Sequence, residues 1–151
     1  IQILTAIASM LIFLKWNWEP SKIFMGDCGS NYLGGLIFFC ILSEEEYLVN
    51  FKTIFIALPI LIDCSWCIIR RFINKENIFT AHKKHLYQRL HQAGWKHSKV
   101  SLLYIIGTLI MSFCIFHKNI YFLGLLILTE FIIGYLLDKN IAVSFKTEGT
   151  Y

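Results

Sequence analysis

The sequence predicts an all-α integral membrane protein with about five transmembrane helices, the C-terminal part of a larger polytopic helical bundle. Of its 151 residues, 56% are hydrophobic, and the mean hydropathy is +0.58. Soluble domains are about 45–50% apolar. The excess is gathered into runs with almost no charge, as in membrane spans. Because the chain starts at Ile1, inside the first run, we expect residues 1–151 to form the C-terminal part of one membrane domain.

Hydrophobic runs mark the expected spans. In chain order they cover residues 1–14, 31–42, 54–69, 102–116 and 120–137. A spanning helix needs about 20 apolar residues, so several runs need flanking polar and aromatic residues to complete the span. Pro20 fits a loop, and Pro59 is expected to kink the third helix.

The charges of the connecting loops predict their orientation. Residues 70–101 carry eight basic residues and one acid, whereas residues 43–51 carry three glutamates, Glu44 to Glu46, and no basic residue. The positive-inside rule therefore places residues 70–101 in the cytoplasm, and alternation of the helices places residues 15–30 there as well. The tail from Asp138 follows on the same side, with residues 43–51 and 117–119 outside. We expect a multi-pass protein of the bacterial plasma membrane whose loops 15–30 and 70–101 contribute to one site.

Two features lie inside the third run. Cys64 and Cys67 form a CxxC pair, but in an apolar segment such thiols behave as small hydrophobic residues, so we favour packing over redox chemistry. Asp63 is an ionisable residue in a predicted span, which marks a candidate functional group. Its alternative role, which we favour slightly, is to pair with a basic residue or a backbone donor within the bundle.

The stretch SKIFMGDCGSNYLGG, residues 21–35, places one carboxylate, Asp27, in a glycine-rich turn at the mouth of the second run. Gly29 or Ser30 could cap the helix that follows. The amides at the start of such a helix attract phosphate, and Mg²⁺ commonly takes one or two carboxylates together with substrate phosphates. The alternative is that Asp27 only caps the helix, and the residues themselves leave both interpretations open.

The basic loop contains the stretch FTAHKKHLYQRLHQAGW, residues 79–95. His82 and His85 are three apart and would share one face of a helix. With Lys83, Lys84 and Arg89 they predict an anion-binding surface. It could be a solvated positive-inside loop, a contact for lipid headgroups or a nucleotide diphosphate site. Zinc is disfavoured because no cysteine or other well-spaced ligand accompanies the pair.

Two longer stretches, WNWEPSKIFMGDCGSNYLGG and RRFINKENIFTAHKKHLYQRLHQAGW, carry a family resemblance. The first resembles the signature of the polyprenyl-phosphate N-acetylhexosamine-1-phosphate transferases, the glycosyltransferase family 4 type that includes the MraY and WecA enzymes. The second resembles the histidine loop of the WbpL-like O-antigen branch. The resemblance implies Mg²⁺-dependent transfer of N-acetylhexosamine-1-phosphate from a UDP-N-acetyl sugar to undecaprenyl phosphate at the cytoplasmic face. UMP is released, and synthesis of a lipid-linked glycan such as O-antigen or capsule begins.

The resemblance also implies roles for individual residues. Asp27 matches the metal-binding catalytic aspartate, and His85 matches a catalytic histidine near the diphosphate. Phe24 matches an aromatic residue that packs on uracil, and Asn17 an asparagine that lines the nucleotide site. The remaining predicted substrate-binding residues are Lys22, Gly26, Gly29, Ser30, His82, Lys83 and Arg89.

Departures from the family pattern leave a second interpretation open. Where many relatives carry several adjacent histidines, this chain reads His85, Leu86, Tyr87 and Gln88. The family's N-terminal Asp-Asp and N-x-x-N-x-x-D-G motifs are absent from the sequence. The alternative is therefore a non-catalytic subunit or a degenerate membrane paralogue. We expect no nucleic-acid partner, and the sequence leaves a homodimer open.

Overall fold

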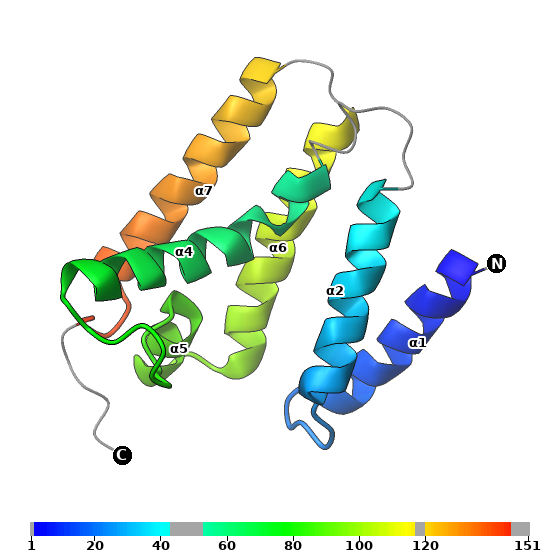
Figure 1. Ribbon diagram of the computed structural model, residues 1–151, viewed down its shortest axis with the longest axis horizontal. Coiled ribbons are helices and arrows are strands. Elements are labelled where there is room, and N and C mark those ends of the chain that lie inside the picture. The colour runs from blue at the N-terminus through cyan, green and yellow to red at the C-terminus, as the bar shows by residue number, and fades with distance from the viewer. Residues whose placement is uncertain (1, 43–52, 117–119, 146–151) are drawn as a thin grey trace. The chain divides into compact units, whose positions relative to one another are not determined.

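The computed structural model describes residues 2–42, 53–116 and 120–145, and these residues form helices joined by loops, with no strand among them (Figure 1). The all-α prediction is confirmed for this part of the chain. The helices are α1 (Gln2–Asn17), α2 (Gly26–Leu42), the 3-10 helix η1 (Phe55–Ala57), α4 (Leu58–Ile73), α5 (Leu86–Gln92), α6 (His97–Phe116) and α7 (Ile120–Asn140). The chain divides into two compact units, residues 1–45 and 46–151. The predicted outer loops, 43–51 and 117–119, lie outside the described residues.

Helix α7 provides the structural support for a membrane protein. Among the described residues it is the one helix that combines the length, 21 residues, and the apolar composition needed to cross a bilayer. Leu125 and Leu128 on this helix are each 56% exposed, as suits a surface that contacts lipid. Shorter apolar helices cover residues 4–17 and 97–113. The number of five spans stays a prediction.

The first unit is a pair of helices, α1 and α2, joined by a short turn (blue and cyan in Figure 1). The sequence placed the second helix at about residue 31, whereas α2 begins at Gly26. Gly26 has a φ of +66°, a left-handed conformation that glycine adopts without a steric penalty. Asp27 therefore lies in the first turn of α2, and Gly29 and Ser30 lie within the helix. The prediction that Gly29 or Ser30 caps it was wrong.

The second unit is built around α4, which crosses both α6 and α7 (Figure 1). Its apolar core contains Met111, Leu123 and Leu126. Pro59 lies in the first turn of α4, directly after η1, and not at a kink inside a longer helix. A proline is favoured there because its missing N–H would have had no partner within the helix. In place of the predicted kink near the outer half of the third helix, the structure has a 3-10 turn at Phe55–Ala57 and a new helix start at Leu58.

The basic loop packs against these helices. Its one helix, α5, contacts α4, α6 and α7. The segment that follows α7 closes over it, because the Val143 N–H donates to the Arg89 carbonyl at 3.4 Å. Phe145 is only 5% exposed. The loop is thus part of the folded core of this unit.

Candidate functional site

The turn between α1 and α2, together with the first residues of α2, carries the family signature and is called the signature turn below. Hydrogen bonds join the two ends of this turn. The side-chain amide Nδ2 of Asn17 donates to the carbonyl of Ile23 at 2.8 Å. The backbone N–H of Lys22 donates to the carbonyl of Trp16 at 2.9 Å. Asn17, predicted to line a nucleotide site, therefore also shapes the turn that carries the other signature residues.

The side chains of this turn form an exposed surface that is suited to binding a ligand. Lys22, Phe24, Asp27 and Ser30 are all exposed, and Phe24 is 79% exposed. The Lys22 ammonium lies 5.4 Å from the ring centroid of Trp16. The Ser30 hydroxyl donates to the Asp27 carbonyl at 3.1 Å. The arrangement offers a cation, an aromatic face and a carboxylate beside the amides of a helix N-terminus.

Gly29 leaves room for the side chain of Met25 in the same turn. A Cβ built at Gly29 would lie 2.3 Å from Cγ of Met25, so a larger residue here would force the Met25 side chain to move. Gly26 and Gly29 thus serve different needs, one a backbone angle and the other space.

The histidine loop of the second unit differs from the prediction in its backbone. Residues 81–84 are not helical, and His85 is the N-cap of α5 with an extended backbone. His82 and His85 therefore do not share a helix face. Their rings nevertheless lie together, with centroids 4.9 Å apart. Burial, followed by the nearby charge of Arg71, lowers the pKa of the His82 imidazole.

Arg71 fixes the first half of this loop onto α4. It is 3% exposed, and its guanidinium donates to the Ile78 and Thr80 carbonyls, to the Thr80 hydroxyl and, by a very short contact, to the Asn77 carbonyl. Its Nε lies 3.3 Å from the Glu76 carboxylate. An arginine that satisfies so many carbonyls in one turn holds that turn in a single conformation.

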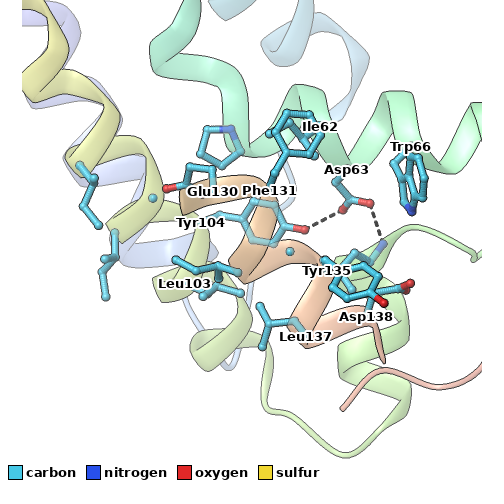
Figure 2. Close-up of a pocket in the computed structure, with 17 residues that line it drawn as sticks. Ile62, Asp63, Trp66, Leu103, Tyr104, Glu130, Phe131, Tyr135, Leu137 and Asp138 are labelled. Carbon is cyan, nitrogen blue, oxygen red and sulfur yellow. Dashed lines mark hydrogen bonds between the residues drawn. The ribbon is translucent and has the colours of Figure 1, made fainter. Parts of the chain in front are cut away.

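Asp63 fixes the second half of the loop (Figure 2). Its carboxylate accepts the backbone N–H groups of Leu86, at 2.7 Å, and Tyr87, at 3.3 Å. It also accepts the Tyr104 hydroxyl at 2.7 Å. The partner-in-the-bundle role that the sequence analysis favoured slightly is confirmed, with backbone amides as the partners. A residue of α4 thereby holds the start of α5.

Three of the basic residues in the loop differ in what they contact. Arg89 is 4% exposed, forms an ion pair with Asp138 and donates to the Val143 carbonyl at 2.9 Å. Lys84 pairs with Glu76 at 2.8 Å. Lys83 is exposed. The predicted anion-binding surface is therefore smaller than the sequence indicated, because Arg89 and Lys84 are occupied by carboxylates.

An apolar cavity of about 220 Å³ lies between α4, α6 and α7 (Figure 2). Its walls include Ile62, Leu103 and Phe131. Asp63 and Leu86 also line it, so the cavity reaches the start of α5. A ligand with an apolar body and a polar end could lie here with its polar end near the histidine loop.

The structure also brings Cys67 to the histidine pair. Its sulfur and one ring nitrogen from each of His82 and His85 all lie within 4.8 Å of one another. Zinc was disfavoured because no cysteine accompanies the pair in the sequence, and that reason is wrong. Cys67 lies on α4, and the loop between it and the histidines has no periodic pattern from which its path could be predicted. The CxxC pair was the one sequence feature that marked Cys67 as a candidate ligand.

Comparison with known proteins gives a common family. Residues 1–44 match the sequence profile of glycosyl transferase family 4. A probable undecaprenyl-phosphate N-acetylglucosaminyl 1-phosphate transferase of Bacillus subtilis is 40% identical over 111 residues, 69% of this chain and 30% of that protein. A phospho-N-acetylmuramoyl-pentapeptide-transferase of Thermotoga petrophila is 32% identical over 108 residues, 70% of this chain and 34% of that protein. The chain belongs to glycosyl transferase family 4.

Family membership confirms the resemblance drawn from the signature turn, which lies within the matched residues 1–44. The chain spans about a third of the length of these two curated relatives, 30% and 34%. No solved structure matches it. The assignment of this glycosyl transferase family 4 chain to the WbpL-like branch, and the roles of its individual site residues, stay predictions.

Proposed function

We propose that the full-length protein transfers N-acetylhexosamine-1-phosphate from a UDP-sugar to undecaprenyl phosphate, releasing UMP and starting lipid-linked glycan synthesis at the cytoplasmic face of the plasma membrane. The Bacillus subtilis relative bears the name of a probable N-acetylglucosaminyl 1-phosphate transferase acting on undecaprenyl phosphate. N-acetylglucosamine is therefore the first donor sugar to test. The observation that carries the proposal is the exposed Asp27 in the first turn of α2, within the residues that match the family.

The donor set at Asp27 fits Mg²⁺. The residue offers an exposed carboxylate, and Mg²⁺ usually takes one or two carboxylates and completes its shell with water and substrate phosphates. Mg²⁺ held by Asp27 would neutralise charge on the diphosphate of the donor.

The turn itself would bind the nucleotide. Phe24 offers an exposed aromatic face on which the uracil ring can stack. Lys22 is placed to bind a phosphate oxygen, and the amides at the start of α2 favour a negative group at the same end of the helix. Asn17 would act through the turn it closes, since its amide nitrogen already donates to Ile23.

The second unit would bind the lipid acceptor. The cavity between α4, α6 and α7 is largely apolar and suits part of a polyprenyl chain that enters from the bilayer. His82, Lys83 and His85 would then face phosphate groups at the polar end. Arg89 is assigned a positioning role here, because its guanidinium is engaged by Asp138 and Val143. The proposal requires residues 15–30 and 70–101 to face one compartment, as their charges predict.

The test uses the full-length protein in membranes, supplied with undecaprenyl phosphate, Mg²⁺ and a panel of UDP-N-acetyl sugars. We expect UMP release that depends on the lipid and is abolished by EDTA. Asp27→Asn should lower turnover by about 100-fold or more, as is typical when a charge-stabilising group is lost. Cys28→Ser, which alters the neighbouring exposed thiol, should leave turnover unchanged.

Two results would reject parts of this proposal. Full turnover in Asp27→Asn protein would exclude the metal-binding role of Asp27. Absence of UMP release from every sugar, in protein shown to be folded, would favour the degenerate paralogue or the non-catalytic subunit.

A further inference from the structure

A cluster of metal-ligating side chains occurs where α4 meets the basic loop. It joins Cys67 on α4, His82 in the non-helical segment and His85 at the start of α5. The three donor atoms lie within 4.8 Å of one another, and Cys67 is 2% exposed. We propose that Cys67, His82 and His85 form a binding site for a borderline-soft divalent cation, with Zn²⁺ as its best chemical match.

The distances require only a small adjustment. Zinc bonds of about 2.3 Å to sulfur and about 2.0–2.1 Å to nitrogen place tetrahedral ligands roughly 3.4–3.6 Å apart. The donors of Cys67, His82 and His85 already lie within 4.8 Å, so each needs to move by no more than about 1 Å. A change of rotamer or a small loop shift supplies that movement.

Two separate sets of hydrogen bonds hold His82 and His85 near Cys67. The guanidinium of Arg71 donates to the carbonyl and the hydroxyl of Thr80, just before His82. The bonds from Asp63 hold Leu86 and Tyr87, just after His85. Both anchors belong to α4, the helix that carries Cys67. The loop is therefore preorganised toward the thiol before any ion binds, which lowers the entropy lost on binding.

The carboxylate of Asp63 beside His85 favours a cation at the cluster. The Nδ1 atom of His85 is buried and lies 3.8 Å from Oδ1 of Asp63. The hydrogen bonds that Asp63 accepts come from uncharged donors, the amides of Leu86 and Tyr87 and the Tyr104 hydroxyl. Metal-bound histidines commonly donate their second ring N–H to a carboxylate. Asp63 is placed to orient His85 in this way and to balance the charge of the ion.

Carboxylates offset part of the charge of the neighbouring cations. Arg71 and Lys84 share the carboxylate of Glu76, and Arg70 and Arg89 share that of Asp138. Asp63 adds a third carboxylate 3.8 Å from His85, and the thiolate that Cys67 forms on binding a metal would supply a fourth negative charge against these four cations.

The ligand set selects the class of metal. One thiolate and two imidazoles favour Zn²⁺ and similar transition ions, whereas Mg²⁺ requires oxygen ligands. The site is therefore distinct from the one proposed at Asp27. As the metal–sulfur bond forms, the Cys67 thiol gives its proton to water.

Three protein ligands leave a fourth position for water or for a phosphate oxygen. The ion would fasten the histidine loop to α4, and it is compatible with phosphate binding nearby. The site does not depend on the proposed transferase activity, because its test measures bound metal and not turnover.

The experiment uses the full-length protein purified in detergent, stripped with chelator and titrated with Co²⁺, a coloured probe, and then with Zn²⁺. We expect about one equivalent of Co²⁺ to give tetrahedral and thiolate-to-metal absorption bands, and Zn²⁺ to displace it. Cys67→Ser should abolish the thiolate band. His82→Ala should weaken binding by at least about 10-fold.

Two control variants remove a thiol and an imidazole outside the cluster. Cys64→Ser removes the other thiol of the CxxC pair and should keep the thiolate band. His97→Ala alters the stacked His91–His97 pair, outside the cluster, and should keep the affinity. Absence of a thiolate band in unsubstituted protein, or its survival in Cys67→Ser, would overturn the proposal. If Cys67→Ser does not fold, unchanged affinity and spectrum in His82→Ala overturn it equally.

Discussion

Replacing Asp63 with alanine tests how α4 holds the histidine loop. The substitution removes the acceptor of the Leu86 and Tyr87 amides, bonded at 2.7 and 3.3 Å. It also leaves the hydroxyl of Tyr104, bonded at 2.7 Å, without this partner. The first loss should loosen the start of α5, and the second should lower the free energy of unfolding of the helix bundle.

The two effects have separate magnitudes. Losing an acceptor at a helix start costs about 0.5–2 kcal/mol, so we expect about 2 kcal/mol for Leu86 and Tyr87 together. Since about 1.4 kcal/mol is a factor of ten, their amides should exchange about 30-fold faster. A buried hydroxyl without its partner costs about 1–3 kcal/mol more, which should lower the melting temperature.

Hydrogen exchange followed by mass spectrometry, in detergent or nanodiscs, measures the first effect on peptides that cover residues 85–92. Tyr104→Phe is the matched control, because it removes the hydroxyl and keeps both amide bonds to Asp63. This variant should lower the melting temperature slightly and leave exchange at Leu86 and Tyr87 unchanged. Equal protection of these amides in Asp63→Ala and unsubstituted protein would refute the anchoring role of Asp63.

Two further predictions concern the turn and the loop. Gly26→Ala forces a side chain into a φ of +66° and should cost about 1–2 kcal/mol, whereas Gly35→Ala, which meets no atom within 4 Å inside α2, should be neutral or slightly stabilising. Thermal unfolding of the two variants checks this, and a melting temperature for Gly26→Ala equal to or above that of Gly35→Ala would contradict it. The hydrogen bond from Lys84 lowers the pKa of Glu76 below its ordinary value of 4.5. A lowered carboxyl pKa stabilises the fold above the unfolded pKa, and this contribution is lost as the pH falls through the folded value. Melting temperatures from pH 7 to about pH 3.5 should therefore fall less steeply in Glu76→Gln, and identical slopes would show that the ion pair contributes nothing measurable.

The signature turn shows what sequence can determine about a site. Its residues are contiguous, so the positions of Asn17, Phe24 and Asp27 along the chain already define a compact unit. The start of α2 was placed too late because the hydrophobic pattern begins after the glycines, although the helical backbone begins at Gly26. Hydrophobicity reports burial and membrane contact, whereas a helix terminus depends on local hydrogen bonds and φ values.

The basic loop shows the opposite case. From sequence, Lys84 and Arg89 belong with the cations that would face an anion. The structure engages them instead with Glu76 and Asp138, which come from elsewhere in the loop and from α7. Opposite charges attract wherever the fold brings them together, and separation along the chain does not reveal that meeting.

The sequence by itself determined the helical class, the apolar character of the chain and the family signature around Asp27, because these depend on composition, period and contiguous residues. Only the tertiary structure decided that Arg71 and Asp63 fasten the histidine loop to α4, and that Cys67 meets His82 and His85. These contacts join residues far apart in the chain. Their existence depends on how helices cross and on which buried polar groups find partners, and both are properties of the packed chain.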